Sequence, residues 1–528
     1  MVKYIDQKFE QLKIKYEGAL QDSLDHLPVT AVFAVIVLTS IYFLYATSKH
    51  ELAPVEDQGI IISQLTTEPN ASLHQTELYS NEVFKIYQSF PETERVFQLN
   101  GINGLNSAIV GMGLKAWDKR SRTSNQLQPL VQKKLNGITG AIIAAFQLPP
   151  LPGSRGVPVQ FVITSTDPFD RLNEVNQTFL DEVRKTGIFI FTDTDLKIDK
   201  AQTNIVLNRD KTAEFGLTMS DVASTLAGLI SQNYINYFNY SGRSYQVIPQ
   251  LDRDQRYNMK QILNYYINTS TNLSIPFGTI ADLKTIVVPE SLNHFQQLNS
   301  ATLSAVPAPG VTDGDALNRL NEIAASILPQ GYTIDYGGPS RQFIQEGNAL
   351  VTTFFFALIV IFLSLAALFE SFRDPVIVLI SVPMSICGAL IFICLGVGGA
   401  SLNIYTEVGL VTLIGLISKH GILMVQFAND LQLEGLGKRE SIEKAAAIRL
   451  RPILMTTAAM VFGVIPLITA TGAGAVSRFN IGLVIGTGLS IGTLFTLFVV
   501  PAMYMFLAED HLKKKAIVDA IRKDMVID

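Results

Sequence analysis

Long uncharged runs alternate with segments of mixed polarity along this chain. Residues 27–48 contain no Asp, Glu, Lys or Arg, and neither do residues 347–369 and 375–406. Two further uncharged runs, residues 452–477 and 479–508, lie near the C-terminus. A bilayer crossing needs about 20 predominantly apolar residues. The pattern therefore predicts several membrane-spanning helices.

The number of crossings follows from where these runs divide. Residues 375–406 are too long for one helix, and the small and polar residues 396–403 are the natural place to split them. Residues 405–427 then form another crossing, interrupted only by Glu407, Lys419 and His420. The sequence thus predicts a membrane α-helical bundle of six helices, one over residues 27–48 and five within residues 347–508.

Basic residues predict the orientation of these helices. Lysines and arginines are frequent in residues 1–26, in the loop after the fourth helix and in the tail 509–528. These segments share one side of a six-helix topology, and the positive-inside rule makes that side cytoplasmic. The insert 49–346 is then outside the cytoplasm. Residues 1–26 have helical apolar spacing, which favours an amphipathic helix on the membrane surface or one packed on a neighbouring subunit.

The insert alternates strand-like and helix-like segments. Residues 159–165 and 332–336 have strand patterns, whereas residues 168–186 and 316–328 have helical patterns. Such strand–helix–strand units favour α+β subdomains of the ferredoxin-like split βαβ kind. Near the middle of the insert, residues 240–243 (Tyr-Ser-Gly-Arg) are typical of a hairpin tip, which either docks a neighbouring molecule or is a solvated turn. A helix over residues 221–230 is expected to be capped by Ser220.

Composition narrows the function classes. Only 16% of residues are charged and 48% are apolar, which excludes a disordered chain. The net charge is −5, without a basic domain, so nucleic acid is not an expected partner. The insert has no nucleophile elbow, HExxH motif or metal-ligand cluster. We therefore expect no enzyme activity, no metal and no cofactor.

Lys419 is the most informative single residue. It lies near the middle of an apolar helix, and an ionisable group at that depth is costly unless it is paired. The other apolar helices carry no carboxylate, and Glu407 is twelve residues away on the same helix. The sequence therefore predicts an acidic partner on another polypeptide or on a missing part of this one. The adjacent His420 faces elsewhere on the helix and is expected to be a satisfied buried histidine.

Several motifs carry a family resemblance. Residues 51–59 (ELAPVEDQG), 365–371 (LAALFES), the segment around Lys419, residues 449–456 (RLRPILMT) and residues 471–475 (TGAGA) occur in this order. Together they resemble the resistance–nodulation–division (RND) multidrug efflux pumps of the hydrophobe/amphiphile efflux branch. The resemblance is to the C-terminal half of such a pump, because full-length members have about twice this length and twelve crossings.

The resemblance implies a proton-driven transporter in the bacterial inner membrane that works as a trimer with a periplasmic adaptor protein and an outer-membrane channel. It implies that the chain exports amphiphilic or hydrophobic compounds. It also implies a proton relay of Lys419, Arg449 and Thr456, whose partner is an aspartate pair in the N-terminal half. The implied periplasmic parts are a first porter subdomain (about 58–155), a second (156–200 and 296–338) and a docking subdomain (201–295).

The resemblance also marks a candidate substrate pocket and its departures from the family. Phe97, Ile102 and Gly111 stand where the family has pocket phenylalanines, and only Phe97 keeps the aromatic ring. A glycine-rich switch loop falls at Gly101, Asn103 and Gly104 and is shorter than usual. Less aromatic surface puts a broad aromatic drug spectrum in doubt.

Two other interpretations stay open. The chain is alternatively the non-functional product of an interrupted pump gene, which would fold locally and transport nothing. A membrane receptor or an export factor of the same superfamily is a further alternative, against which the large insert and its hairpin weigh.

Overall fold

The computed structural model describes most of the chain. It covers residues 2–102, 104–151, 156–230, 234–256, 258–269 and 273–510. The chain divides into two compact units, of which the second is Leu196–Asn293 and the first is the remainder. Asn103 of the expected switch loop and residues 511–528 of the expected tail lie outside the described residues.

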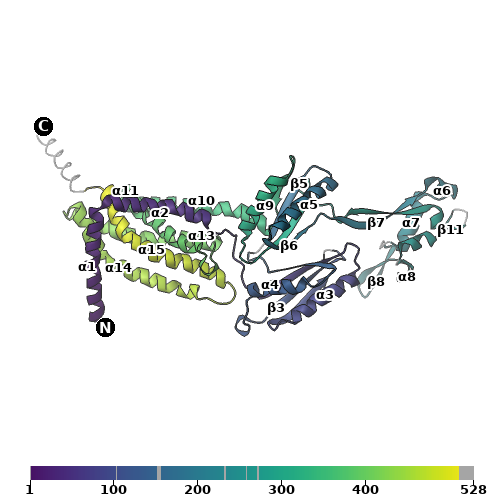
Figure 1. Cartoon of the computed structure of the whole chain (residues 1–528), viewed down its shortest axis with the longest axis horizontal. Helices are drawn as coiled ribbons and strands as arrows, with labels where there is room; N and C mark the ends of the chain where they lie inside the picture. Colours follow the sequence, from purple (N-terminus) through teal and green to yellow (C-terminus); the bar gives the residue numbers. More distant parts are fainter. Residues whose placement is uncertain are drawn as a thin grey trace. The chain divides into compact units, whose positions relative to one another are not determined.

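Among the described residues, six helices are long and apolar enough to span a membrane, as the uncharged runs predict. In Figure 1 they form a bundle in which α15 lies among the others. The break expected within residues 396–403 is confirmed, because a short 3₁₀ turn, Val397–Gly399, separates two of these helices. The six spans are α2 (Leu27–Thr47), α10 (Gly338–Phe369), α11 with α12 (Arg373–Leu379 and Ser381–Cys394), α13 (Ile404–Leu433), α14 (Lys438–Ile468) and α15 (Ala475–Leu507).

Glycines bring α15 close to its neighbours. Gly488 and Gly492 face α12 and α13, and a Cβ on Gly492 would lie 2.4 Å from the Ser385 hydroxyl oxygen. A Cβ on Gly488 would lie 2.3 Å from a methyl group of Leu413. Small residues thus allow close helix packing here, as is common in membrane bundles.

The N-terminal helix α1 (Val2–Asp25) packs on the chain's own bundle. Its apolar face includes Leu20 and Leu24, which are buried, and Tyr16, whose hydroxyl donates to the Leu497 carbonyl at 2.7 Å. Figure 1 shows α1 crossing the end of the helices. The amphipathic pattern therefore reflects packing against α14 and α15 of the same chain.

The described residues of the insert within the first unit form two sheets of similar topology. In each, strands and helices follow the order β-α-β-β-α-β, with the first and third strands at the centre, which is the split βαβ arrangement. The first comprises β1 (Ile60–Thr67), α3 (Leu73–Gln88), β2 (Thr93–Asn100), β3 (Ser107–Leu114), α4 (Ser124–Leu135) and β4 (Ala141–Phe146). The second comprises β5 (Val159–Ser165), α5 (Phe169–Lys185), β6 (Phe189–Thr194), β14 (Leu298–Pro307), α9 (Asp313–Ile327) and β15 (Thr333–Tyr336), with the short β13 (His294–Phe295) beside β14.

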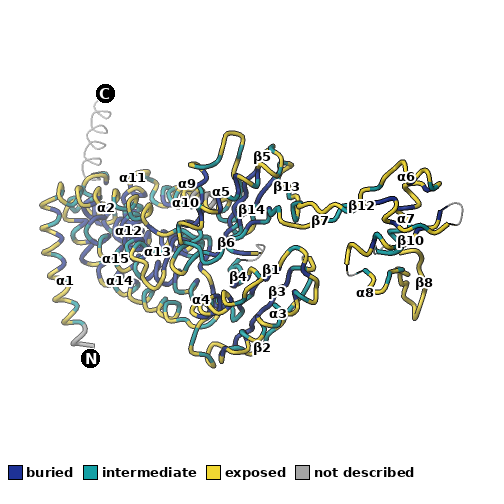
Figure 2. The backbone as a smooth tube through the Cα atoms, turned by 45° about the vertical axis from the view of Figure 1, so that its right-hand side comes forward, coloured by how far each residue is buried: buried dark blue, intermediate teal, exposed yellow. Residues whose placement is uncertain are grey.

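The second unit is inserted between β6 and β14 of the second sheet. Its hairpin β8–β9 turns at Ser241 and Gly242, both at positive φ, and is exposed along its length (Figure 2). The expected Ser220 cap is wrong: Thr218 and Asp221 bond reciprocally, so the helix begins at Met219. The described elements are β7 (Ile198–Leu207), α6 (Arg209–Glu214), α7 (Met219–Ile230), β8 (Asn236–Tyr240), β9 (Arg243–Val247), α8 (Arg253–Arg256), β10 (Tyr266–Asn268), β11 (Ser274–Pro276) and β12 (Ala281–Pro289).

Candidate proton-relay site

Lys419 lies at the centre of α13 on an exposed face of that helix. The exposed positions of α13 recur every three, four or seven residues and therefore form one stripe along it. The stripe consists of Val408, Thr412, Gly415, Lys419, Gln426, Asp430 and Leu433. No ion pair found among the described residues involves Lys419. The ion pairs of the neighbouring helix α14 join Arg439 and Arg451 to acidic residues instead. The amine therefore points away from the packed side of the helix, and no carboxylate of the described residues pairs with it.

A buried polar cluster lies beside Lys419 on the packed side. His420 of α13 is fully buried, and its two ring nitrogens lie 3.3 Å from the Thr457 hydroxyl and 3.4 Å from the Thr493 hydroxyl. The two threonine hydroxyls are 3.2 Å apart. This cluster joins α13, α14 and α15 at one level and supports the expectation of a satisfied buried histidine. Successive helical residues point about 100° apart, so anchoring His420 also fixes the direction of Lys419.

Thr456 and Arg449 lie at different depths along α14. Thr456 precedes Thr457 and so lies at the level of His420 and Lys419, with its hydroxyl bonded to the Pro452 and Ile453 carbonyls at 2.9 and 3.0 Å. Arg449 is seven residues earlier, about 10 Å along the axis at 1.5 Å per residue.

The Arg449 guanidinium is held by an aromatic ring. It lies 4.5 Å from the ring centre of Phe427 on α13, which is a cation–π distance, and its buried Nε has no hydrogen-bond partner among the described residues. Lys419 and Thr456 thus share one level, whereas Arg449 lies two turns away. Sequence reasoning missed Phe427 and Thr493, because only the fold brings them to this site.

The candidate substrate residues lie on the first sheet of the insert. Phe97 of β2 pairs with Gly111 of β3, and its ring covers Gly111 so closely that an added Cβ would lie 2.1 Å from a ring carbon. Phe97 is nevertheless 43% exposed, and Ile102 in the following loop is 51% exposed. The structure therefore brings Phe97 and Gly111 together, whereas Ile102 lies in the loop beyond the paired strands.

The expected switch loop connects β2 to β3. Gly101 and Gly104 both have positive φ, at 79° and 140°. The Gly101 amide donates to the Ser107 carbonyl and the Ser107 amide donates to the Gly104 carbonyl, at 2.8 and 3.0 Å. These two bonds join the two ends of the loop beside the paired strands.

The segment after α2 joins the helices to the insert. The Glu51 amide donates to the Leu402 carbonyl at 3.0 Å, and the Gly314 amide at the start of α9 donates to the His50 carbonyl at 3.2 Å. The Glu56 carboxylate accepts from the amide of Ser477 at 2.7 Å and from its hydroxyl, at the start of α15. The residues of the ELAPVEDQG motif thus connect helix ends that are far apart in sequence.

Two carboxyl groups at this junction hold protons more tightly than usual. Burial raises the pKa of Glu51 to about 7, although the Ser401 hydroxyl donates to its carboxylate and Lys49 opposes the shift. Asp313 and Asp315 add smaller contributions in the same direction as burial. Burial also raises the pKa of Asp313 to about 6. The raised pKa of either carboxyl group cannot be read from the sequence, since the burial of both depends on contacts between distant segments.

A family comparison matches residues 1–508 to one family of transporters. The chain belongs to the AcrB/AcrD/AcrF family. Its relatives include RND multidrug and solvent efflux pump transporters, in agreement with the sequence motifs. Within the described part of this RND family member, no three His, Cys, Asp or Glu side chains are grouped to hold a metal ion.

Individual relatives match most of this chain but only part of themselves. An uncharacterised transporter of Haemophilus influenzae is 41% identical over 91% of this chain and 47% of its own length. The toluene efflux pump membrane transporter TtgB of Pseudomonas putida is 28% identical over 95% of this chain and 49% of its own length. The multidrug export protein AcrF of Escherichia coli is 28% identical over 90% and 47%. The chain spans about half the length of the curated relatives it matches.

Proposed function

We propose that this chain is one half of a proton-driven RND exporter, corresponding to the C-terminal half of a complete pump. In this proposal the six helices cross the bacterial inner membrane, both termini are cytoplasmic and the insert is periplasmic. The missing half lies on another polypeptide or in a longer form of this one. It supplies the aspartate pair that faces Lys419.

The exposed stripe of α13 is the observation that carries this proposal. A lysine at the centre of a membrane helix is costly when it is unpaired, and the described residues offer Lys419 no carboxylate. The stripe also includes Gly415, whose Cβ position opens into free space. A second helix could therefore approach α13 closely at the level of Lys419 and present its acidic groups there.

The proposed relay is a two-state electrostatic switch. When the partner carboxylates are ionised they attract Lys419, and when one is protonated the lysine is released to reorient. The buried cluster of His420, Thr457 and Thr493 holds α13, α14 and α15 in register, so motion at Lys419 is transmitted to all three helices. Thr456 and Arg449 complete the polar path along α14.

The proposed export route leads through the insert. Its two βαββαβ sheets correspond to the porter subdomains of the family, and Leu196–Asn293 to the docking subdomain. The exposed aromatic hairpin β8–β9 suits a protein surface such as an adaptor or an outer-membrane channel. Three complete pump units would form the working trimer, and the single aromatic ring at Phe97 offers little stacking surface for large aromatic compounds.

Drug susceptibility tests this proposal. We would express this chain alone, an N-terminal-half polypeptide carrying the aspartates alone, and both together in a pump-deficient bacterial strain. Resistance that requires both polypeptides supports the half-pump function. The proposal would be contradicted if both polypeptides are inserted in the membrane and co-purify but the drug susceptibility of the strain does not change. That result would favour the interrupted-gene alternative.

A further inference from the structure

Glu56 and Asp57 are adjacent carboxylates that bind different parts of the protein. The Glu56 carboxylate accepts from the Ser477 amide at 2.7 Å and from the Ser477 hydroxyl, in the first turn of α15. The Asp57 carboxylate accepts from the amide of Ser124, the first residue of α4, at 3.1 Å. One carboxylate therefore holds a membrane helix, and its neighbour in sequence holds a helix of the first sheet of the insert.

Other contacts strengthen the Asp57 end of this junction. The Asp57 carboxylate also accepts from the Arg120 guanidinium at 2.7 Å and from the Gly59 amide at 3.0 Å. The Trp117 indole donates to the Asp57 carbonyl at 3.0 Å. A Cβ on Gly472, in the loop between α14 and α15, would lie 3.8 Å from the Trp117 ring. Trp117 therefore contacts both sides of the junction.

The connection between the two ends is short and buried. Adjacent Cα atoms are about 3.8 Å apart across a trans peptide bond, and Glu56 and Asp57 are each only 7% exposed. Hydrogen bonds to an ionised carboxylate are roughly twice as strong as those between neutral groups. A displacement of this end of α15 therefore either moves α4 with it or breaks a charge-assisted hydrogen bond.

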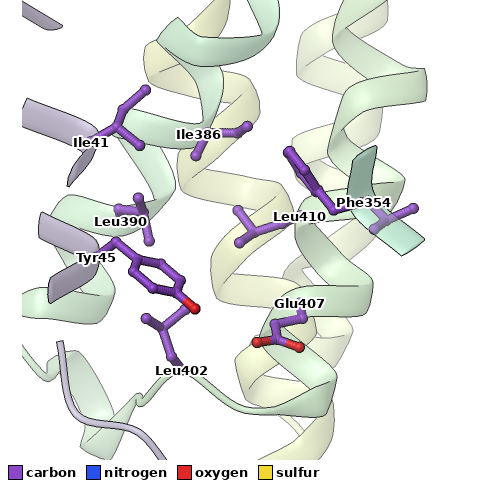
Figure 3. Close-up of a pocket in the computed structure, with 9 residues that line it drawn as sticks. Ile41, Tyr45, Phe354, Ile386, Leu390, Leu402, Glu407 and Leu410 are labelled. Carbon is purple, nitrogen blue, oxygen red and sulfur yellow. The ribbon is translucent and has the colours of Figure 1, made fainter. Parts of the chain in front are cut away.

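Another junction between the membrane helices and the insert packs beside a cavity. There the Glu51 amide donates to the Leu402 carbonyl at 3.0 Å. Leu402 also lines a cavity of about 260 Å³ among α2, α10, α12 and α13, with Tyr45 and Glu407 in its wall (Figure 3). Side chains beside a cavity lack packing contacts on that side and resist displacement less than those in a filled core. The junction at Glu56 and Asp57 is therefore the stiffer of the two.

The helix that Glu56 holds also reaches the candidate proton relay. The Thr493 hydroxyl of α15 lies 3.4 Å from a ring nitrogen of His420, the neighbour of Lys419 on α13. Sixteen residues separate Thr493 from Ser477, about 24 Å along the axis at 1.5 Å per residue. No proline interrupts this part of α15, so it moves as one rod. Movement beside Lys419 is thereby carried to the Glu56 carboxylate.

We propose that Glu56 and Asp57 are positioning residues that transmit the movement of α15 to α4, and so couple proton transfer at Lys419 to the first sheet of the insert. The mechanical link rests on the junction alone, whereas its use in transport rests on the proposed exporter function. Without the Glu56 carboxylate the relay still switches, but α4 no longer follows α15. Protons then cross the membrane without export of substrate.

Amide hydrogen exchange on the purified chain in nanodiscs measures the mechanical link without any partner polypeptide. Glu56→Ala removes the bonds to Ser477, and we expect exchange at least about threefold faster at the Ser124 amide, which is bonded to Asp57 instead. Glu56→Gln keeps an oxygen that accepts from Ser477 and should restore most of the protection. Asp118→Ala, at an exposed carboxylate beside Trp117, is the control and should exchange like the parent.

Fluxes in proteoliposomes measure the coupling in the reconstituted pair of polypeptides. Export of a fluorescent amphiphile and proton flux are followed together. We expect Glu56→Ala to lower the number of amphiphile molecules exported per proton at least about threefold while proton flux continues. Glu56→Gln should restore the ratio, and Asp118→Ala should not change it. A purely structural defect would instead lower both fluxes in proportion and leave the ratio unchanged.

Two results would overturn the inference. The first is parental exchange at Ser124 in Glu56→Ala although the start of α15 exchanges faster, and the second is an unchanged ratio of amphiphile to protons. If Glu56→Ala does not fold, Ser477→Ala removes the hydroxyl bond alone and should change exchange and ratio less, in the same directions. Absence of export by the unaltered pair contradicts the half-pump proposal instead, and exchange at Ser124 still decides the mechanical link.

Discussion

Replacing Glu51 by glutamine should change how the stability of the protein depends on pH. The Glu51 carboxyl lies at the junction of α2, α9 and the segment before α13, where burial raises its pKa from 4.5 to about 7. Glutamine keeps an oxygen that accepts from the Ser401 hydroxyl and removes the titration. The variant therefore isolates the cost of ionising this side chain in the folded state.

The magnitude follows from the two pKa values. Each tenfold change in proton affinity corresponds to about 1.4 kcal/mol, so a rise from 4.5 to about 7 corresponds to about 3 kcal/mol. The folded state binds this proton more tightly than the unfolded state, so stability falls as pH rises from 4.5 through 7 and then levels off. Because the side chain is only partly buried, we take about 3 kcal/mol as an upper bound.

Thermal unfolding in detergent, followed by fluorescence of the single tryptophan, Trp117, measures the effect. We expect Glu51→Gln to raise the midpoint by several degrees above pH about 8 and to change it little below pH about 4.5. Infrared difference spectra should show one carboxyl band, titrating near pH 7, that is missing in the variant. Glu434→Gln, at the exposed C-terminal end of α13, is the matched control. A difference between variant and parent that is the same at every pH would refute the reasoning.

Three further substitutions test other parts of the structure. Gly492→Ala should destabilise the bundle by about 1–3 kcal/mol because its methyl group would clash with Ser385. Gly415→Ala, on the exposed stripe of α13, is the control and should have little effect on thermal unfolding. Arg122→Ala removes an ion pair in which the arginine donates two hydrogen bonds to the buried Glu92 carboxylate and holds the pKa of that carboxyl low. The variant should therefore lose stability at pH values above the pKa of an ordinary glutamate and lose less at acid pH, as urea unfolding at several pH values would show. Thr493→Val removes one hydrogen bond to the buried His420 and should lower the free energy of unfolding by about 1 kcal/mol without preventing folding. Circular dichroism on heating measures this change.

Charge and apolar length alone predict the helices of the membrane bundle. A helix in lipid satisfies the hydrogen-bonding groups of its own backbone, so few other structures can span the membrane. Uncharged runs such as residues 27–48 and 479–508 therefore predict helices directly. The strand at Val159–Ser165 is likewise predicted at its observed bounds, because its apolar run is flanked by clear breaks. The cap of α7 was predicted wrongly, since Thr218 and Ser220 have equal capping chemistry and only Asp221 decides between them.

The site is only partly predictable because its groups come from distant segments. Lys419 stands out from an apolar background in the sequence, and the structure places it on an exposed face of α13. Nothing in the sequence brings Thr493 to His420 or Phe427 to Arg449, because those contacts depend on how helices pack. The amphipathic pattern of residues 1–26 fits several environments equally, and only the fold shows that Tyr16 contacts α15.

Energy coupling through Lys419 is the central claim, and efflux by the reconstituted pair tests it most directly. The chain and an N-terminal-half polypeptide are co-expressed, and export of a fluorescent amphiphile is followed after the cells are energised. The test variant is Lys419→Ala. The control is Lys444→Ala, because Lys444 is an exposed lysine near the start of α14. We predict that Lys419→Ala abolishes export although both polypeptides are present at normal levels, and that Lys444→Ala exports normally. Export that continues at the parental rate in Lys419→Ala would contradict the account.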